Sequence, residues 1–182
     1  PVGVSYDRAE GDAPTLDNVV TESPSLTEHL MWQMKLSTFN GEEVRVGEQI
    51  IGNLDSNGYL RATVEEIARL ENVAEEFVEK VLKKVQEFDP AGVAARDLQE
   101  CLLIQAGMFA RENPLIEPII REHLKELELK NYLQIARRLK VPLKEVETAV
   151  LLISKMDPKP GAVYSEEKAQ SIIPDVYVVK SG

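Results

Sequence analysis

The side chains in this chain that could do chemistry are a few carboxylates near residue 60, two histidines and one cysteine. Positions 1, 3 and 12 of a calcium-binding EF-hand loop are matched by Asp55, Asn57 and Glu66. Position 6 of such a loop needs a glycine for its sharp turn, but this chain has Leu60 there. The spacing therefore argues against a calcium site.

The histidines and the cysteine have no ligand set around them. His29 and His123 are far apart in the sequence, with neither cysteine nor clustered carboxylates nearby, so a zinc site lacks ligands. Both His123 and Cys101 fall on apolar helix faces, where such side chains usually pack in the core. The chain has no phosphate-binding glycine loop, nucleophile elbow or dinucleotide fingerprint. We therefore predict that the chain is not an enzyme and binds no metal or cofactor.

Composition limits the kind of protein further. The 182 residues are 43% hydrophobic and 29% charged, as in ordinary globular proteins. One cysteine, no apparent secretion signal and no apolar run of about 20 residues predict a cytoplasmic protein that does not span a membrane. The net charge of −10 disfavours non-specific binding of the whole chain to a nucleic-acid backbone.

Apolar residues at helical spacing predict an all-α fold. Capping boxes at Ser25 and Thr63 mark two helix starts, because the hydroxyl and a glutamate three residues later each satisfy a free amide. The acidic segment 1–23 lacks helical periodicity and is predicted to be a flexible linker, whereas Ile172 to Val179 is predicted to be an extended tail. In the first half of the chain, helices are expected at about 26–38, between Gly41 and Asn57, and from Thr63 through Leu70, followed by a longer helix that ends at Asp89. In the second half, helices are expected around Leu98 to Gln105, around Ile116 to Leu127, from Asn131 through Leu139, and from Pro142 to Asp157.

The chain contains the same two-helix pattern twice. An offset of 68 positions aligns residues 63–89, the first unit, with residues 131–157, the second unit, without a gap. Ile67-Ala68-Arg69 matches Ile135-Ala136-Arg137, and Asp89-Pro90 matches Asp157-Pro158. A small alanine, a tight turn and a longer helix are typical of two helices that cross closely, as in a helix-turn-helix. Because proline disfavours helix in the residue before it, we expect Asp-Pro to end both longer helices.

The two units differ in charge. The first unit has eight acidic and four basic residues, and the second has three acidic and five basic residues. Phosphate should therefore repel the first unit, which leaves two interpretations of the second: a packing motif with a solvated face, or a surface that contacts DNA.

Longer motifs lie at five places in the chain: Leu26–Leu36, Ile51–Leu60, Phe88–Gln105, Met156–Gly161 and Ile173–Val178. Together they resemble the sigma-54 family of RNA polymerase sigma factors, in the portion that binds core polymerase. The resemblance covers about residues 24–180, and its most specific part is the Asp-Pro-Ala-Gly-Val-Ala-Ala-Arg-Asp-Leu run that begins at Asp89. This run is expected to form a junction between helices, since Gly92 permits a backbone turn that a Cβ would resist. Its motif residues are Asp89, Pro90, Gly92, Val93, Ala95, Arg96, Leu98 and Cys101.

The resemblance implies a fragment of a transcription initiation factor that docks on core RNA polymerase, through the beta and beta-prime subunits. In this family, promoter DNA is recognised by C-terminal regions, and a separate ATPase activator acts on the full-length factor through an N-terminal region. We expect both regions to be missing here. We also considered a stand-alone DNA-binding regulator that uses the basic second unit, and an accessory domain of an enzyme.

The expected architecture is two helical-bundle subdomains, 24–110 and 111–160, each containing one helix-turn-helix-like unit. Residues 161–182 would form an extended linker toward a DNA-binding domain. Charged positions near the shared motifs are candidates for contacts with polymerase, and structural salt bridges are the alternative explanation. These candidates are Arg96, Arg137, Arg138 and Lys140.

Overall fold

The computed structural model describes residues 24–109 and 113–165, and it confirms the predicted all-α class for this part of the chain. The acidic linker expected at 1–23 and the extended segment expected from Ile172 to Val179 lie outside the described residues. None of the described helices is long and apolar enough to cross a membrane. The helices are α1 (Leu26–Leu36), α2 (Gly41–Gly52), α3 (Val64–Glu71), α4 (Glu75–Val85), α5 (Leu98–Phe109), α6 (Ile116–Glu122), α7 (Leu124–Glu128), α8 (Tyr132–Leu139), α9 (Leu143–Ile153) and α10 (Ala162–Ser165).

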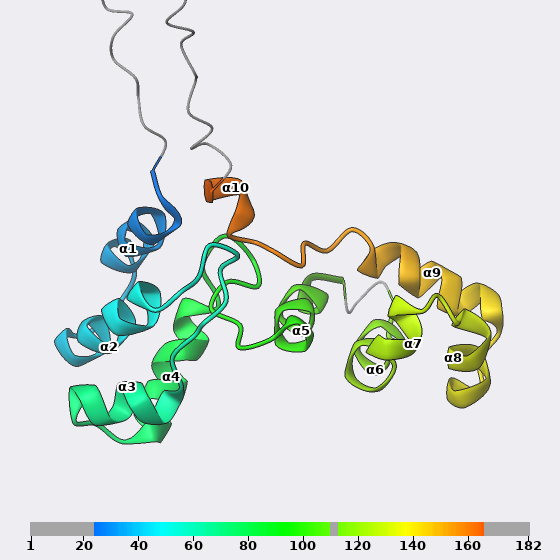
Figure 1. The fold of residues 1–182 in the computed structure, drawn as a ribbon, viewed down its shortest axis with the longest axis horizontal. Helices are drawn as coiled ribbons and strands as arrows, with labels where there is room; N and C mark the ends of the chain where they lie inside the picture. Colours follow the sequence, from blue (N-terminus) through cyan, green and yellow to red (C-terminus); the bar gives the residue numbers. More distant parts are fainter. Residues whose placement is uncertain (1–23, 110–112, 166–182) are drawn as a thin grey trace, which may run out of the picture.

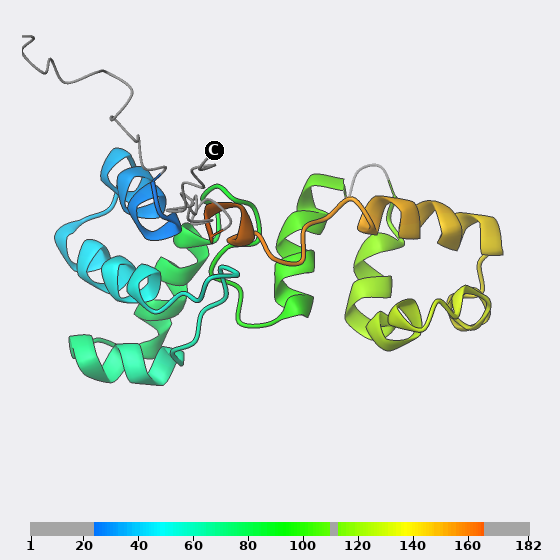
Figure 2. The same cartoon turned by 45° about the horizontal axis from the view of Figure 1, so that its top comes forward.

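The helices form two lobes, each with its own hydrophobic core (Figure 1). The first lobe packs α1 to α4 around side chains such as Leu30, Ile50 and Val81, which have no exposed surface. The second lobe packs α5 to α9 around Ile119 and Ile135, which are equally buried. The turned view separates the lobes clearly and shows α10 next to the first lobe, at the end of a segment that returns from α9 (Figure 2).

The packing of α5 bears on the expected division between the lobes at 110/111. Leu102 and Ala106 of α5 belong to the second core, and Leu98 packs against it. The last residue of the first core is Ala94. Because α5 buries its apolar face against α6 and α9, we propose a division before Leu98, with α5 as the first helix of the second lobe.

Side-chain caps explain where several helices begin. The predicted boxes at Ser25 and Thr63 are confirmed, and a third, which the sequence analysis missed, joins Asn40 to Glu43 at the start of α2. Asn131 was expected to cap α8, but its side chain bonds to the Gln134 side chain and makes no cap bond. In each box the N-cap side chain accepts a bond from the amide three residues on, which satisfies a donor that has no partner within the helix.

The repeated units have the same helix bounds at the same offset. The short helices α3 and α8 each end at a residue with left-handed backbone, Asn72 (φ 54°) and Lys140 (φ 56°). After each, the amide of the next valine bonds to the carbonyl of the buried alanine, Ala68 or Ala136, which closes the helix end. The longer helices α4 and α9 then begin at Glu75 and Leu143. The sequence repeat therefore corresponds to a repeated pair of helices.

The expected helix ends at Asp89-Pro90 and Asp157-Pro158 are wrong. Helix α4 ends at Val85 and α9 at Ile153, four residues before each aspartate. The intervening residues form tighter turns, in which the amides of Phe88 and Met156 bond to the carbonyls three residues earlier. Both residues are more than 90% buried, so each is anchored in its core just after the last residue of the helix.

Only the start of the segment 161–182, which was expected to be an extended linker, lies within the described residues. It begins with the short helix α10, in which the amide of Tyr164 bonds to the carbonyl of Gly161. The Tyr164 ring lies 5.1 Å from the His29 ring of α1. This contact holds the start of the segment against the first lobe.

Candidate functional site

The motif junction begins with a backbone segment held by a side chain from α1. Gln33 accepts a hydrogen bond from the Asp89 amide (2.9 Å) and donates one to the Asp89 carbonyl (2.5 Å). The Asp89-Pro90 peptide bond is cis. Since one glutamine satisfies both backbone groups of Asp89, the junction is fixed to the first helix of the lobe.

The turn expected at Gly92 is confirmed. Gly92 has φ +92°, a backbone conformation that residues with a Cβ rarely adopt. A Cβ built there would lie 2.7 Å from Gln105 Nε2 and 2.8 Å from Cys101 Sγ. Val93 and Ala95, which follow, have no exposed surface. The junction therefore fits closely against α5 and acts as architecture.

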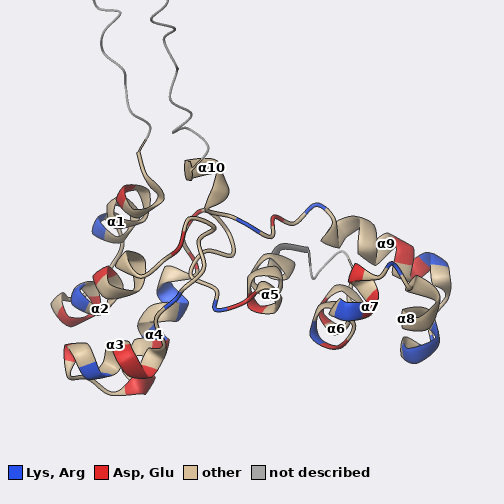
Figure 3. Ribbon diagram, viewed as in Figure 1, with Lys and Arg blue, Asp and Glu red and all other residues tan. Residues whose placement is uncertain are grey.

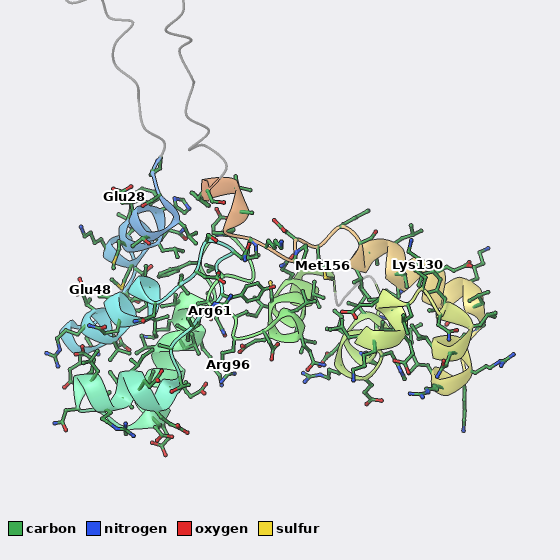
Figure 4. The ribbon with its side chains drawn as sticks, viewed as in Figure 1. Glu28, Glu48, Arg61, Arg96, Lys130 and Met156 are labelled. Carbon is green, nitrogen blue, oxygen red and sulfur yellow. The ribbon has the colours of Figure 1, made fainter. Side chains whose placement is uncertain are left out.

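Arg96 pairs within the molecule instead of pointing freely outward. Its guanidinium donates to Glu79 of α4 (2.9 Å) and to Glu100 of α5 (2.8 Å and 3.0 Å). Figure 4 labels Arg96 where the chain passes from the first lobe to α5. Of the two explanations for this residue, the structure supports the salt bridge. Arg96 thus joins the end of one lobe to the first helix of the other.

The environment of Glu100 determines its charge. Burial acts to raise its pKa, but hydrogen bonds from the Arg96 side chain, the Arg96 amide and Gln86 outweigh this effect and lower the pKa below its usual value. The carboxylate is thus stabilised in its ionised form.

We expect Glu100→Gln to lower the free energy of unfolding by about 1 to 2 kcal/mol at pH 7, because it replaces a charged acceptor of several hydrogen bonds. Since the folded-state pKa of Glu100 is lowered, its stabilisation is fully present above the unfolded-state pKa. It is lost as the pH falls through the folded-state value. Urea unfolding from pH 7 down to pH 3 should show the difference between the two proteins disappearing at the acidic end.

Glu117→Gln is the matched control, because Glu117 also pairs with an arginine, Arg121, but on an exposed helix surface. We expect this change to alter the free energy of unfolding by no more than about 0.5 kcal/mol. A Glu100→Gln effect that stays constant down to pH 3 would contradict an electrostatic origin.

Cys101 is buried, as predicted, and lies beside Gln105, a second glutamine that bonds to an Asp-Pro backbone. Burial raises the pKa of the Cys101 thiol, so the thiol stays protonated and unreactive at neutral pH. Beside it, Gln105 accepts from the Asp157 amide (2.8 Å) and donates to the Asp157 carbonyl (2.6 Å). This arrangement repeats, in the second lobe, the contact of Gln33 with Asp89.

The repeat also includes the first helix of each lobe, which the offset of 68 alone does not reveal. Leu26, Leu30 and Gln33 of α1 match Leu98, Leu102 and Gln105 of α5 at an offset of 72, and Glu28 matches Glu100. This match is visible in the sequence, but only when a gap of four residues is allowed, because the helices align at an offset of 72 and the units at an offset of 68. Each glutamine then holds the Asp-Pro backbone at the end of its own lobe.

The Asp-Pro-Lys-Pro-Gly motif, residues 157–161, forms the interlobe segment that ties the second lobe to the first. Tyr59 donates its hydroxyl to the Pro158 carbonyl, and the Gly161 amide donates to the Asn57 carbonyl (2.9 Å). Burial contributes most to raising the pKa of Tyr59 to about 12, so this hydroxyl remains a donor at neutral pH. The segment thus connects two loops that are about a hundred residues apart in the sequence.

The residues of the EF-hand-like pattern serve the same loop. Asp55 accepts from the amides of Asn57 and Tyr59 and pairs with Arg61. Within residues 24–109 and 113–165, no group of three histidine, cysteine or acidic residues is placed to hold a metal ion. Asp55 therefore orders the loop that receives the interlobe segment.

The other three candidate contacts lie together on the second unit. Arg138 donates to Glu126 of α7 (2.9 Å), whereas Arg137 and Lys140 are exposed and form no ion pair with other described residues. In Figure 3, blue residues gather on α8, and red residues are prominent on α3. The structure thus separates Arg96, at the interlobe junction, from a basic group at the far end of the second lobe.

These features define a two-lobed helical module with repeated units and a buried, hydrogen-bonded junction. Comparison with known proteins agrees with the motifs that the junction carries. A family model described as the core binding domain of sigma-54 factor matches residues 15–182. The chain belongs to the sigma-54 factor family.

Two sigma-54 factors support the assignment. The RNA polymerase sigma-54 factor of Escherichia coli (strain K12) is 35% identical, over 99% of this chain and 39% of that protein. The corresponding factor of Shewanella violacea is 36% identical, over 87% of this chain and 33% of that protein. A solved structure of the core binding domain of sigma54 is 27% identical, with a TM-score of 0.43, and covers 68% of this chain and 95% of that one.

The chain therefore spans between 33% and 39% of the length of these two relatives. The alternative of a stand-alone DNA-binding regulator is wrong, because the family match includes both lobes and not the second unit alone.

Proposed function

We propose that this chain docks on core RNA polymerase and links the enzyme to the rest of a sigma-54 factor. The observation that carries the proposal is the match of residues 15–182 to the core binding domain of that family. The structure is compatible with such a role, since each lobe has its own buried core and hydrogen bonds of the interlobe segment join the two lobes. A preformed surface reduces the entropy lost on binding.

The partners follow from the same assignment. We propose that the chain contacts the beta and beta-prime subunits of core polymerase in the bacterial cytoplasm. Recognition of promoter DNA and the response to an ATPase activator are proposed to belong to other parts of the factor. The chain itself would contribute binding and no catalysis.

The predicted polymerase contacts now have unequal support. Arg96 is engaged by Glu79 and Glu100, so we propose that it contributes chiefly by joining the lobes. Arg137 and Lys140 are exposed without an ion-pair partner among the described residues, and Arg138 is half exposed beside them. We propose that these three contact polymerase directly.

The proposal is tested by measuring the affinity of the fluorescently labelled chain for a bacterial core RNA polymerase by anisotropy. We expect saturable binding that unlabelled full-length sigma-54 factor abolishes by competition. Charge reversal of both Arg137 and Lys140 should weaken binding by at least about tenfold. Arg121→Glu on α6 is the control, because this exposed arginine lies on another helix, where it pairs with Glu117. No binding at micromolar concentration would contradict the proposed function.

A further inference from the structure

The two repeated units permit a direct comparison of their exposed corners, where the short helix meets the long one. In the first unit, this corner is an open concavity with polar lining at Glu65, Arg69, Asn72 and Glu75. Ala68, Val73 and Ala74 form its floor. A mixed-charge lining of this kind is well solvated and offers no apolar anchor to a partner.

The second unit has different residues at the same positions. Leucines replace both glutamates, as Leu133 and Leu143, and Lys140 replaces the asparagine, while Arg137 is retained. We call these four residues the second-unit corner. Leu133, Arg137 and Lys140 are spaced four and three apart, so they lie along one side of α8 and its C-terminal turn.

Three side chains of the second-unit corner, Leu133, Arg137 and Lys140, are exposed, whereas Leu143 is half-buried and packs against the second core. The Leu133 side chain is 58% exposed, and Leu129, just before α8, is 79% exposed. Single exposed leucines are common on protein surfaces. Here, however, Leu133 lies on the same side of α8 as two exposed cations that form no ion pair with other described residues. Apolar anchors next to unpaired cations suit a partner that is both acidic and apolar.

A nucleic-acid backbone is a poorer match for this corner. Phosphate contacts are made by basic and polar side chains and by helix N-termini, and leucine contributes nothing to them. A protein partner, by contrast, can contact both the leucines and the cations of the corner.

We infer that the second-unit corner binds an acidic, apolar segment on the surface of core RNA polymerase. Apolar side chains of that segment cover Leu133 and the exposed part of Leu143, and its carboxylates meet Arg137 and Lys140. The inference rests on the proposed function, because it names the partner chemistry at one docking surface. It also explains why the two units share a backbone but differ at the corner.

The inference is tested with substitutions that give the second unit the residues of the first. Leu133→Glu and Lys140→Asn should each weaken the affinity of the chain for core polymerase, the former by at least about tenfold. Leu70→Glu is the matched control, since Leu70 is 66% exposed on the short helix of the first unit. It should leave the affinity within about twofold of the original. Circular dichroism checks that every variant remains folded.

These outcomes separate the inference from the function on which it rests. If the unaltered chain does not bind polymerase, the proposed function fails. If it binds, but Leu133→Glu and Lys140→Asn bind equally well, only the inference fails. Asparagine tolerates the left-handed backbone at position 140, so Lys140→Asn tests the corner even if Leu133→Glu disturbs folding.

A crosslinking experiment identifies the partner. Lys144→Cys places an exposed thiol at the start of α9 for a photoreactive label, while the native Cys101 is fully buried and should not react. The labelled chain is irradiated with core polymerase and duplex DNA present together. A crosslink to an acidic, apolar peptide of polymerase supports the inference. Crosslinks to DNA, to a second copy of the chain, or to nothing would overturn it.

Discussion

Gly92→Ala is expected to lower the free energy of unfolding by about 3 kcal/mol, which is a large part of the stability of a typical domain. Two costs combine at this position. The backbone has φ +92°, which alanine adopts only with strain, and the new methyl group would lie under 3 Å from both Gln105 and Cys101. Relief of the overlap requires movement of Gln105, which would break its contacts with the Asp157 backbone. Urea unfolding followed by circular dichroism measures the change.

Gly107→Ala is the control for this substitution. Gly107 lies in α5, near the same residues in sequence, but a Cβ there would meet no atom within 4 Å. Because alanine favours helix more than glycine does, we expect this variant to be as stable as the original or more stable by up to about 1 kcal/mol. If both alanine variants are equally stable, the close packing inferred at the junction is wrong.

Gly161→Ala is expected to detach the interlobe segment from the first lobe. A Cβ at this position would lie 2.6 Å from the Gly58 amide nitrogen and 2.7 Å from the Asn57 carbonyl carbon. Both are backbone atoms of an ordered loop, so they cannot move aside as a flexible side chain would. We expect a loss of about 2 kcal/mol in the free energy of unfolding.

The local consequence is more specific than the loss of stability. The Gly161 amide donates to Asn57 and the Ala94 amide donates to Gly58, so both bonds involve the loop that the new methyl group disturbs. Hydrogen exchange should therefore speed up at residues 94 and 161, while amides in the centre of α9 keep their protection. Gly52→Ala, which meets no atom within 4 Å, is the control. Unchanged exchange at residue 161 would show that the segment does not hold the lobes together.

Much of the helical structure could be predicted from the sequence, because its causes are local. Capping boxes at Ser25 and Thr63 satisfy amides three residues away, and the repeated pattern near Ile67 and Ile135 needs only neighbouring residues. The burial of His123 and Cys101 was likewise predictable from helix faces. The residue types and their spacing likewise argued against a calcium site and a zinc site from the sequence alone.

Predictions about the junctions were less successful, for a physical reason. The Asp-Pro pairs suggested helix ends, but the helices end four residues earlier, and the buried Phe88 and Met156 follow them outside the helices. Helix α5 was assigned to the first lobe, yet its apolar face packs in the second. An amphipathic pattern shows that a helix face is buried, but it does not show against which neighbour.

The sequence by itself therefore determined the helices, the repeated unit, the resemblance carried by its motifs and the opposite charges of the two units. Only the tertiary structure decided how these parts join. Gln33 meets Asp89 across 56 positions, Gln105 meets Asp157 across 52, and Tyr59 meets Pro158 across 99. Such contacts depend on how the whole chain closes, and no local spacing encodes them. The same closure pairs Arg96 internally and leaves Arg137 and Lys140 exposed, which moves the proposed docking surface to the second lobe.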